Sequence, residues 1–303
     1  MLTISIINYR EVYATAQCVL DLMATCDGLP YRILLRDHSQ PLQIEAIRTQ
    51  LPVAAPVQYF ASPENPGFGA GHNRNFAAVS HAPGDVFAVM NNDVRVSDGE
   101  ALRAMLEACT ANRIVSCTIL NSAGEVWYSG GTINPVTGDL TTRRDRFVSA
   151  SRSTQFVTGC CLMADAALYR ALGGFDERFF MYGEDLDFCL RARAVKAELV
   201  VVNRAIIHQV GSGQSGLYSD NYLYENTKNR LLCVRRHRLG WPILRVAYFF
   251  LKYGLARAVQ LCLRSQRPLQ QIRQAWRGLL HGYLRSASPA STIAVTAAAG
   301  SPR

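Results

Sequence analysis

The first 93 residues alternate short β-branched runs with amphipathic segments, and this alternation restricts the fold more than any other feature. It predicts strands at 2–8, 31–35, 57–60 and 86–90, with helices at 11–23, 42–50 and 71–79 between them. Strand–helix–strand repeats of this kind build a doubly wound, mostly parallel sheet. The sequence therefore predicts an α/β fold in which residues 1–93 form one half of a domain.

Polar residues follow the predicted strands of this half at the points where the strands end. Asn8 and Asp37 close the first two strands, Asn65 follows the third, and Asp93 follows the fourth. Ligands of doubly wound proteins bind at the carboxyl ends of the strands. We therefore expect these four side chains to converge on one crevice.

The rest of the chain divides into a mixed half, a helical extension and a tail. Residues 94–215 are predicted to complete a domain over 1–215, with strands at 114–120, 156–163 and 198–202 and helices at 101–109, 165–173 and 184–197. Residues 216–285 form a basic amphipathic helical extension, with helices at 222–237 and 241–262 and an apolar helical stripe over 269–283. Residues 286–303, rich in Ala, Ser, Thr and Pro, are predicted to be a disordered tail.

The net positive charge of the chain comes entirely from the extension and the tail. Residues 1–215 hold 18 Lys and Arg against 21 acids, whereas residues 216–303 hold 14 against Asp220 and Glu225 alone. This asymmetry indicates an anionic partner surface, either nucleic acid or the cytoplasmic leaflet of a membrane. Large apolar residues between the arginines favour the membrane, and no nucleic-acid-binding motif accompanies the charge. The alternative is a solvated helical hairpin packed on the domain.

Several familiar segments are missing from the sequence. The apolar run 241–263 is interrupted by Arg245, Lys252 and Arg257, which argues against a membrane-spanning helix. No P-loop, H-E-x-x-H or G-x-S-x-G motif occurs, and the glycine-rich loop at 65–71 lacks the third glycine of a dinucleotide fingerprint. The nine cysteines form no C-x-x-C pair, and the chain starts on a strand without a basic leader. We expect a cytoplasmic protein.

Asp93 and His208 are candidate metal ligands. Asp93 follows a strand together with Asn91 and Asn92, and a carboxylate beside amide oxygens suits Mg²⁺ or Mn²⁺ that takes its other ligands from a bound diphosphate. His208 follows the last strand of the domain. The alternatives are an Asx turn at Asp93 and a hydrogen-bonded core histidine at His208.

Glu184 and Asp185 form an acidic pair at the start of a predicted helix. The aromatic and apolar lead-in over 174–183 would desolvate a carboxylate and raise its basicity, as a general base requires. The alternative is that both acids serve only the helix N-terminus, where negative charge is favourable. Asp187 and Arg191, four residues apart, are predicted to be a structural ion pair.

Together these motifs resemble family 2 inverting glycosyltransferases, especially the bacterial rhamnosyltransferase-like branch, over residues 1–238. The most specific part is the stretch 173–191, which contains Phe-Asp-Glu-Arg-Phe-Phe-Met-Tyr-Gly-Glu-Asp-Leu-Asp, followed by the loop at 64–73. The other matching segments are Ile7-Asn8-Tyr9, Asp37 with Ser39, Asn91-Asn92-Asp93, Thr158-Gly159-Cys160 and His208.

The resemblance implies a GT-A fold, with a Rossmann-like nucleotide half at 1–93 and an acceptor half at 94–215. It also implies a nucleotide-diphosphosugar donor, dTDP- or UDP-linked, and a divalent metal cofactor. By position, Asp37 looks like the residue that binds the pyrimidine base, with Asn8, Asn65 and Gly67 lining the nucleotide.

The remaining roles also come from the resemblance. Asp93 matches the last acid of the family's metal motif, His208 the distal metal contact, and Asp185 the catalytic base. Residues at the donor and acceptor subsite would be Asn92, Gly159 and Glu184. The helix after the sheet adds two candidates for stabilising the leaving diphosphate, Lys228 and Arg230, or else a solvated helix face.

The implied reaction moves rhamnose or another hexose to a hydroxyl of a saccharide or lipid-linked acceptor in cell-surface polysaccharide synthesis. We expect the enzyme to be peripheral at the inner face of the cell membrane, and we expect no nucleic acid as partner. Asn92 departs from the family, which has an acid there, so the metal site has one carboxylate fewer. A catalytically weak nucleotide-sugar-binding protein and a basic nucleic-acid-binding protein stay as alternatives.

Overall fold

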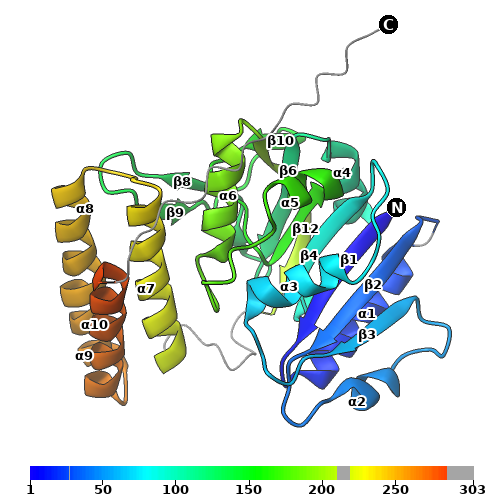
Figure 1. Ribbon diagram of the computed structural model, residues 1–303, viewed down its shortest axis with the longest axis horizontal. Helices are drawn as coiled ribbons and strands as arrows, with labels where there is room; N and C mark the ends of the chain where they lie inside the picture. The colour runs from blue at the N-terminus through cyan, green and yellow to red at the C-terminus, as the bar shows by residue number, and fades with distance from the viewer. Residues whose placement is uncertain (27, 210–218, 285–303) are drawn as a thin grey trace, which may run out of the picture.

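A ten-stranded sheet forms the centre of the protein in a computed structural model that describes residues 1–26, 28–209 and 219–284. Its main strands follow the order β10-β12-β6-β11-β4-β1-β2-β3, while β5 pairs with β12 and β7 with β6. Helices flank the sheet, and a separate helical layer stands beside it (Figure 1). The tail predicted at 286–303 lies outside the described residues.

The first half has the alternation that the sequence predicts. Its elements are β1 (Leu2–Asn8), α1 (Val12–Thr25), β2 (Tyr31–Asp37), α2 (Ile44–Arg48), β3 (Val57–Ala61), α3 (Phe68–Ala77) and β4 (Val86–Asn91). All pairs among these four strands are parallel, in the order β4-β1-β2-β3. The chain steps outward from β1 to β3 and then returns to β4, so right-handed crossovers place α3 on the face opposite α1 and α2.

The second half is mixed, as expected. Its elements are β5 (Val94–Arg95), α4 (Glu100–Ala108), β6 (Arg113–Leu120), β7 (Val126–Tyr128), β8 (Gly131–Ile133), β9 (Leu140–Thr142), β10 (Ser151–Ser153), β11 (Cys161–Asp165), α5 (Ala166–Ala171), α6 (Glu184–Ala194) and β12 (Glu198–His208). Strand β12 runs parallel to β6, and β11 lies antiparallel between β6 and β4. The strands β8 and β9 form a separate hairpin.

Two strand boundaries differ from the prediction by five residues or more. The strand predicted at 156–163 begins only at Cys161, because the preceding residues leave the sheet and the amide of Gly159 bonds to Asp185 on α6. The strand predicted at 198–202 continues to His208, because its far end pairs with β6 as far as Ile207 and with β5 at Ile207 and His208. Both differences come from long-range contacts and place residues of the candidate site.

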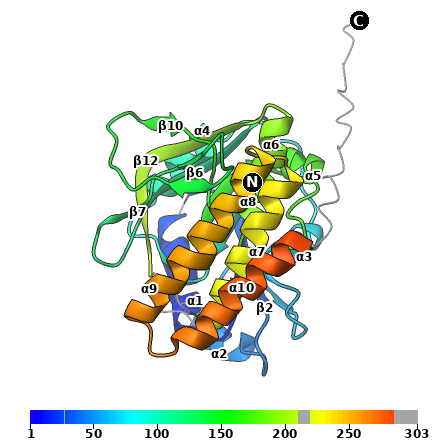
Figure 2. The same ribbon diagram turned by 90° about the vertical axis from the view of Figure 1, so that its left-hand side faces the viewer.

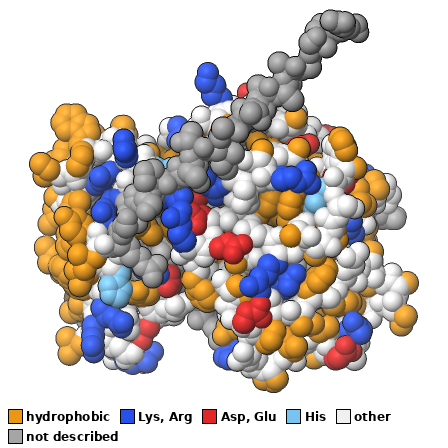
Figure 3. All heavy atoms as spheres, in the orientation of Figure 1, with side chains coloured by type: hydrophobic (Ala, Val, Ile, Leu, Met, Phe, Trp, Pro, Cys, Tyr) orange, Lys and Arg blue, Asp and Glu red, His pale blue; other side chains and the backbone are white. Residues whose placement is uncertain are grey.

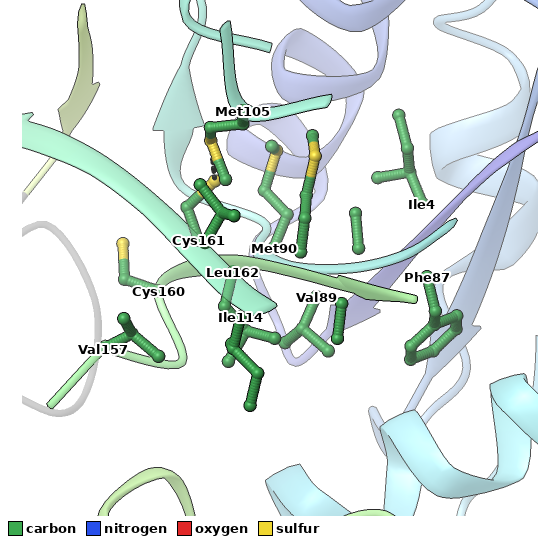
Figure 4. Packing of buried hydrophobic residues seen from close by; sticks show 14 of the residues in the cluster. Ile4, Phe87, Val89, Met90, Met105, Ile114, Val157, Cys160, Cys161 and Leu162 are labelled. Atoms are coloured by element: carbon green, nitrogen blue, oxygen red, sulfur yellow. Dashed lines mark hydrogen bonds between the residues drawn. The ribbon is translucent and has the colours of Figure 1, made fainter. Parts of the chain in front are cut away.

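The core lies between the sheet and its helices. In Figure 4, Met90 of β4 and Cys161 of β11 lie on the same side of the sheet as Met105 of α4, and Val89 and Leu162 of these strands lie on the other side. Continuous apolar strands such as 86–90 are buried on both faces, as parallel sheets covered by helices require. All nine cysteines are free thiols.

The C-terminal extension is helical, as predicted. It consists of α7 (Asp220–Arg236), α8 (Pro242–Phe249), the π-helical turn η1 (Phe250–Ala256), α9 (Arg257–Arg264) and α10 (Pro268–Leu284). The segments α8, η1 and α9 form one continuous rod, which lies beside α10 and α7 (Figure 2). Glycines at 278 and 282 of α10 face backbone carbonyls of α7, so the two helices pack closely.

Candidate functional site

Asn8 and Asp37 lie side by side at the carboxyl ends of β1 and β2, because the two strands are in parallel register there. Both side chains are fully buried. The amide nitrogen of Asn8 donates to Oδ1 of Asp37 at 2.8 Å, and the backbone amides of Ser39 and Gln43 also donate to the Asp37 carboxylate. These three donors occupy three of the about four acceptor positions that a carboxylate offers.

A chain of hydrogen bonds joins these strand ends to the end of β4. The hydroxyl of Thr15 on α1 donates to Oδ1 of Asn8 at 2.8 Å, and the amide of Asn92 donates to the Thr15 hydroxyl at 2.8 Å. Three of the predicted residues, Asn8, Asp37 and Asn92, are therefore connected through one side chain that the sequence analysis missed. Thr15 carries no signal in the sequence, because its role depends on where α1 packs.

The loop before α3 contacts the segment that leads into α6. Gly67 has φ 99°, and the amide of Phe68 donates to the carbonyl of Phe180 at 2.9 Å. A Cβ on Gly67 would lie 2.3 Å from that carbonyl oxygen, so only glycine fits. The Asn65 carboxamide oxygen accepts from the Gly67 amide at 3.3 Å. The predicted nucleotide loop is thus fixed against the second half of the domain.

Asp93 and His208 are brought together by the antiparallel pairing of β5 with β12, in which His208 is opposite Val94. Oδ1 of Asp93 lies 3.0 Å from Nε2 of His208. The same oxygen is buried and has no hydrogen-bond donor among the described residues. An unsatisfied carboxylate oxygen beside an imidazole nitrogen fits a divalent cation such as Mn²⁺, which accepts both ligand types.

Trp127 of β7 is a second residue of this region that the sequence analysis missed. Its ring centroid lies 5.0 Å from that of His208, so it forms an apolar wall beside the Asp93–His208 pair. The amide of Asn91 lies 3.4 Å from Nε2 of His208. The only sequence signal for Trp127 is that it stands next to Tyr128, as an aromatic pair in a region of predicted hairpin turns.

Asp185 is held at the N-terminus of α6 by two backbone amides. Gly159 donates to Oδ2 at 3.1 Å and Leu186 donates to Oδ1 at 2.8 Å. Burial raises the pKa of Asp185, although these two amides and the charge of Arg230 oppose the rise. A Cβ on Gly159 would lie 3.1 Å from the ring of Phe68, so Gly159 fills a narrow space between that ring and Asp185.

Glu184 precedes Asp185 and is almost completely buried. Its Oε2 has no hydrogen-bond partner among the described residues. Burial, followed by the nearby charge of Asp185, raises the pKa of Glu184 well above its ordinary value. Asp185 accepts hydrogen bonds from two backbone amides, whereas Oε2 of Glu184 has no donor in the described part of the chain, so burial disfavours the charged form of Glu184.

Asp187 belongs to an ionic cluster behind this pair. Arg191 donates to its Oδ2 at 2.7 Å, which confirms the predicted ion pair, and Nε2 of His237 lies 2.7 Å from its Oδ1. Burial would raise the pKa of Asp187, but the hydrogen bond from His237 and the charge of Arg191 outweigh it, so the pKa is lowered. Asp187, Cys233 and His237 have metal-ligand spacing, yet Arg191 and Arg236 lie against the same carboxylate and disfavour a cation.

Lys228 and Arg230 both have internal partners. Lys228 is buried and donates to Glu225 at 2.6 Å. Arg230 donates to Asp139 at 3.0 Å and to the hydroxyl of Tyr253 at 2.7 Å. Neither residue forms the solvated helix face that was the alternative. Because these contacts already pair their charges, neither residue is placed to bind a diphosphate.

The sequence is similar to known glycosyltransferases. The profile described as glycosyl transferase family 2 matches residues 3–173. A low-salt glycan biosynthesis hexosyltransferase of Haloferax volcanii is 25% identical over 236 residues, covering 75% of this chain and 75% of the relative. An N-acetylglucosaminyl-diphospho-decaprenol L-rhamnosyltransferase of Mycobacterium tuberculosis is 25% identical over 213 residues, covering 61% of this chain and 69% of the relative.

Solved structures share the fold. The structure of GalNAc-T7 with UDP, GalNAc and Mn²⁺ has a TM-score of 0.61 at 14% identity, over 90% of this chain and 54% of that chain. The mannosyltransferase PcManGT from Pyrobaculum calidifontis with GDP-Man and Mn²⁺ has a TM-score of 0.57 at 13% identity, over 93% of this chain and 85% of that chain. At these identities the likeness concerns the fold alone, which confirms the predicted architecture.

Proposed function

Because this chain belongs to glycosyl transferase family 2 and has the GT-A fold, we propose that it is an inverting hexosyltransferase of glycan synthesis. The donor is a nucleotide-diphosphosugar, with dTDP-rhamnose as the first candidate and UDP-sugars as the second. The acceptor is a hydroxyl of a saccharide or of a lipid-linked saccharide. The relatives named as hexosyltransferase and rhamnosyltransferase support this class of reaction.

The observation that carries the proposal is the Asp185 carboxylate, fixed by the amides of Gly159 and Leu186 and made more basic by burial. In the transfer, Asp185 accepts the proton of the acceptor hydroxyl while that oxygen attacks the anomeric carbon. The bond from this carbon to the diphosphate breaks on the opposite face, and the nucleoside diphosphate leaves with the electron pair. A single displacement inverts the anomeric configuration, and no covalent enzyme intermediate forms.

Glu184 lies directly before Asp185, and burial together with the nearby charge of Asp185 raises its pKa. The two carboxyl groups interact, so their protons are lost in two steps that belong to the pair. Oε2 of Glu184 has no hydrogen-bond partner among the described residues. We therefore assign Glu184 and Gly159 to the acceptor side of the site.

Asp93 and His208 would hold a divalent cation, Mg²⁺ or Mn²⁺, through Oδ1 and Nε2. Bound there, the cation would neutralise charge on the diphosphate. The fold neighbours crystallised with Mn²⁺ support this assignment. Asn92 is engaged by Thr15, so Asp93 supplies the carboxylate of the site without help from its neighbour.

The base of the nucleotide would bind at Asp37. Its remaining acceptor position suits the ring N3–H of thymine or uracil, and Asn8 holds the carboxylate in place. Asn65 and Gly67 would line the nucleotide from the loop before α3. The alternative of a nucleic-acid-binding extension gains no support, because large aliphatic side chains dominate its exposed surface.

A turnover assay tests the proposal. The wild type and Asp185→Asn are incubated with dTDP-rhamnose or UDP-hexoses and saccharide acceptors, and nucleoside diphosphate release and product anomer are measured. Loss of a general base predicts a fall in kcat of about 10²–10⁴-fold, with an inverted product from the wild type. The matched control is Asp145→Asn, an exposed acid paired with Arg152, which should leave kcat unchanged. Equal turnover by Asp185→Asn, or a retained anomer, would contradict the proposal, and an inactive wild type would favour the non-catalytic binder.

A further inference from the structure

An apolar stripe runs along the outer side of the rod formed by α8, η1 and α9. Its side chains follow each other at intervals of seven or four residues, so they share one helix face. They are between 47% and 80% exposed, and they are Leu244, Leu251, Leu255, Val259 and Leu263. Figure 3 shows hydrophobic side chains gathered along the left edge of the molecule, where α8 and α9 lie in Figure 1.

The neighbouring helix α10 extends this stripe into a broader face. Leu269, Trp276, Leu280 and Leu284 are exposed on it at intervals of seven or four residues. The rings of Phe250 on η1 and Trp276 on α10 have centroids 5.9 Å apart and join the two stripes. Soluble monomers rarely leave so long an apolar face uncovered, so it indicates an interaction surface.

The opposite side of the rod is fastened to the catalytic domain. Asp139, between β8 and β9, is buried and accepts hydrogen bonds from Tyr253 at 3.1 Å, Tyr248 at 3.2 Å and Lys252. Phe249 and Tyr253 pack in a buried cluster with residues of α7 and α10. These contacts hold the rod against α7, α10 and the loop between β8 and β9.

By length and composition alone, Pro242–Arg264 could cross a membrane. An 18-residue stretch of it has a mean hydropathy of 1.2, and only 22% of that stretch is buried. Spanning would strip the rod from the domain and place Lys252, without Asp139, in lipid. The packing therefore favours a rod that lies along a membrane surface rather than across it, in agreement with the sequence.

The charge around this face selects the partner. Arg264, Arg267 and Arg273 are exposed at the turn from α9 to α10 and have no acidic partner among the described residues. No acidic residue follows Glu225 in the sequence. Two copies of this face would repel each other, and nucleic acid would leave the leucines in contact with phosphate. Anionic lipid headgroups above acyl chains match both the charge and the apolar stripe.

We propose that α8, η1, α9 and α10 form a monotopic membrane-insertion face, with its leucines in the lipid and Arg264, Arg267 and Arg273 at anionic headgroups. The face does not use the nucleotide crevice, so this inference goes beyond the transfer reaction. Because Asp139 fixes the rod to the domain, the crevice is held in one orientation to the bilayer. A lipid-linked acceptor would then reach Asp185 from a defined side.

Vesicle flotation of the full-length protein tests the proposal. The wild type should float with vesicles containing phosphatidylglycerol and bind pure phosphatidylcholine vesicles much less. The double variant Leu251→Glu/Leu255→Glu should stay in the soluble fraction, whereas Val148→Glu, at a still more exposed site of the catalytic domain, should float. Arg264→Gln with Arg267→Gln should weaken binding about 25-fold, at about fivefold for each arginine near the surface, and Arg144→Gln is its control.

A tryptophan measurement separates insertion along the surface from spanning. With Trp127 and Trp241 replaced by Phe, Trp276 is the only tryptophan of the chain. Lipids brominated near the headgroup should quench it more strongly than lipids brominated near the chain ends, and the reverse order would contradict a surface location. The proposal would be overturned if the wild type did not bind anionic vesicles. It would also be overturned if the wild type sedimented as a dimer that the Leu255→Glu substitution dissociates. Transfer to a soluble acceptor should be equal in Leu251→Glu/Leu255→Glu and wild type, so this test fails or succeeds separately from the transferase assignment.

Discussion

Replacing Gly67 by alanine should destabilise the protein far more than the same change at Gly84. Both glycines have positive φ, 99° and 81°. A Cβ at Gly84 would have no neighbour within 4 Å, whereas at Gly67 it would lie 2.3 Å from the carbonyl oxygen of Phe180. Gly84→Ala therefore measures the backbone conformation alone, which costs about 1–2 kcal/mol for a side chain with positive φ.

Gly67→Ala adds a steric conflict, and the Gly67 backbone, with φ 99° and ψ 175°, lies in a region essentially restricted to glycine. The carbonyl of Phe180 belongs to the backbone and cannot rotate away, so the loop must move off it and lose the hydrogen bond from Phe68. The lost bond contributes about 1 kcal/mol, and the displaced packing typically costs a further 1–3 kcal/mol. We expect a total of about 3–6 kcal/mol for Gly67→Ala.

Urea denaturation followed by circular dichroism measures both variants against the wild type. Gly67→Ala should also raise the KM for the donor, because the displaced loop carries Asn65 of the proposed nucleotide subsite. Equal losses of stability in Gly67→Ala and Gly84→Ala would refute the reasoning, since the contact with Phe180 would then contribute nothing.

Four further predictions concern charge and close packing. Asp139→Asn should lower the free energy of unfolding by about 2 kcal/mol, because the partly exposed Arg230 and Lys252 lose the charge of a buried carboxylate. The exposed Asp145→Asn should cost under about 1 kcal/mol, and urea denaturation measures both. The pKa of Glu184 is raised in the folded state, so this residue lowers the stability of the protein increasingly as the pH rises above its ordinary pKa of 4.5. The stability gained in Glu184→Gln should therefore grow from pH 4.5 upward. Thermal melts measure this gain, and a pH-independent difference between variant and wild type would contradict the prediction. In a plot of kcat/KM against pH, the acid limb should have its midpoint above the ordinary aspartate pKa of about 4, because burial raises the pKa of Asp185 and a general base must be ionised. A midpoint at or below that value would contradict the assignment of Asp185 as the base. Gly159→Ala should lower kcat with little change in donor binding, because the added methyl meets the Phe68 ring and moves the amide that holds Asp185, which steady-state kinetics can check.

The alternation of strands and helices could be predicted from the sequence because local periodicity determines it. The strand ends at Asn8 and Asp37 follow from that periodicity, and parallel register places them side by side. The end of β12 could not be predicted, because pairing with β5 rather than local pattern carries the strand on to His208.

The chemistry of the site was only partly visible in the sequence. The acidic pair at Glu184 and Asp185 stands out by its spacing and aromatic lead-in, but the amide of Gly159 that fixes it comes from a loop predicted as strand. Lys228 and Arg230 have the charge of diphosphate ligands, and only the packing of the extension shows that Glu225 and Asp139 occupy them. Contacts between side chains that are distant in the sequence leave no local sequence pattern, so they could not be predicted from the sequence.

Calorimetric titration of dTDP, UDP and GDP, with and without Mn²⁺, tests the proposed site most directly. The account predicts that the wild type binds dTDP or UDP in a Mn²⁺-dependent way, and that Asp93→Ala loses this dependence while it stays folded. Asp185→Asn should bind like the wild type, because the base contacts the acceptor rather than the nucleotide. If no nucleoside diphosphate bound to the folded wild type, or if Asp93→Ala bound with undiminished Mn²⁺ dependence, the assignment of the crevice would be contradicted.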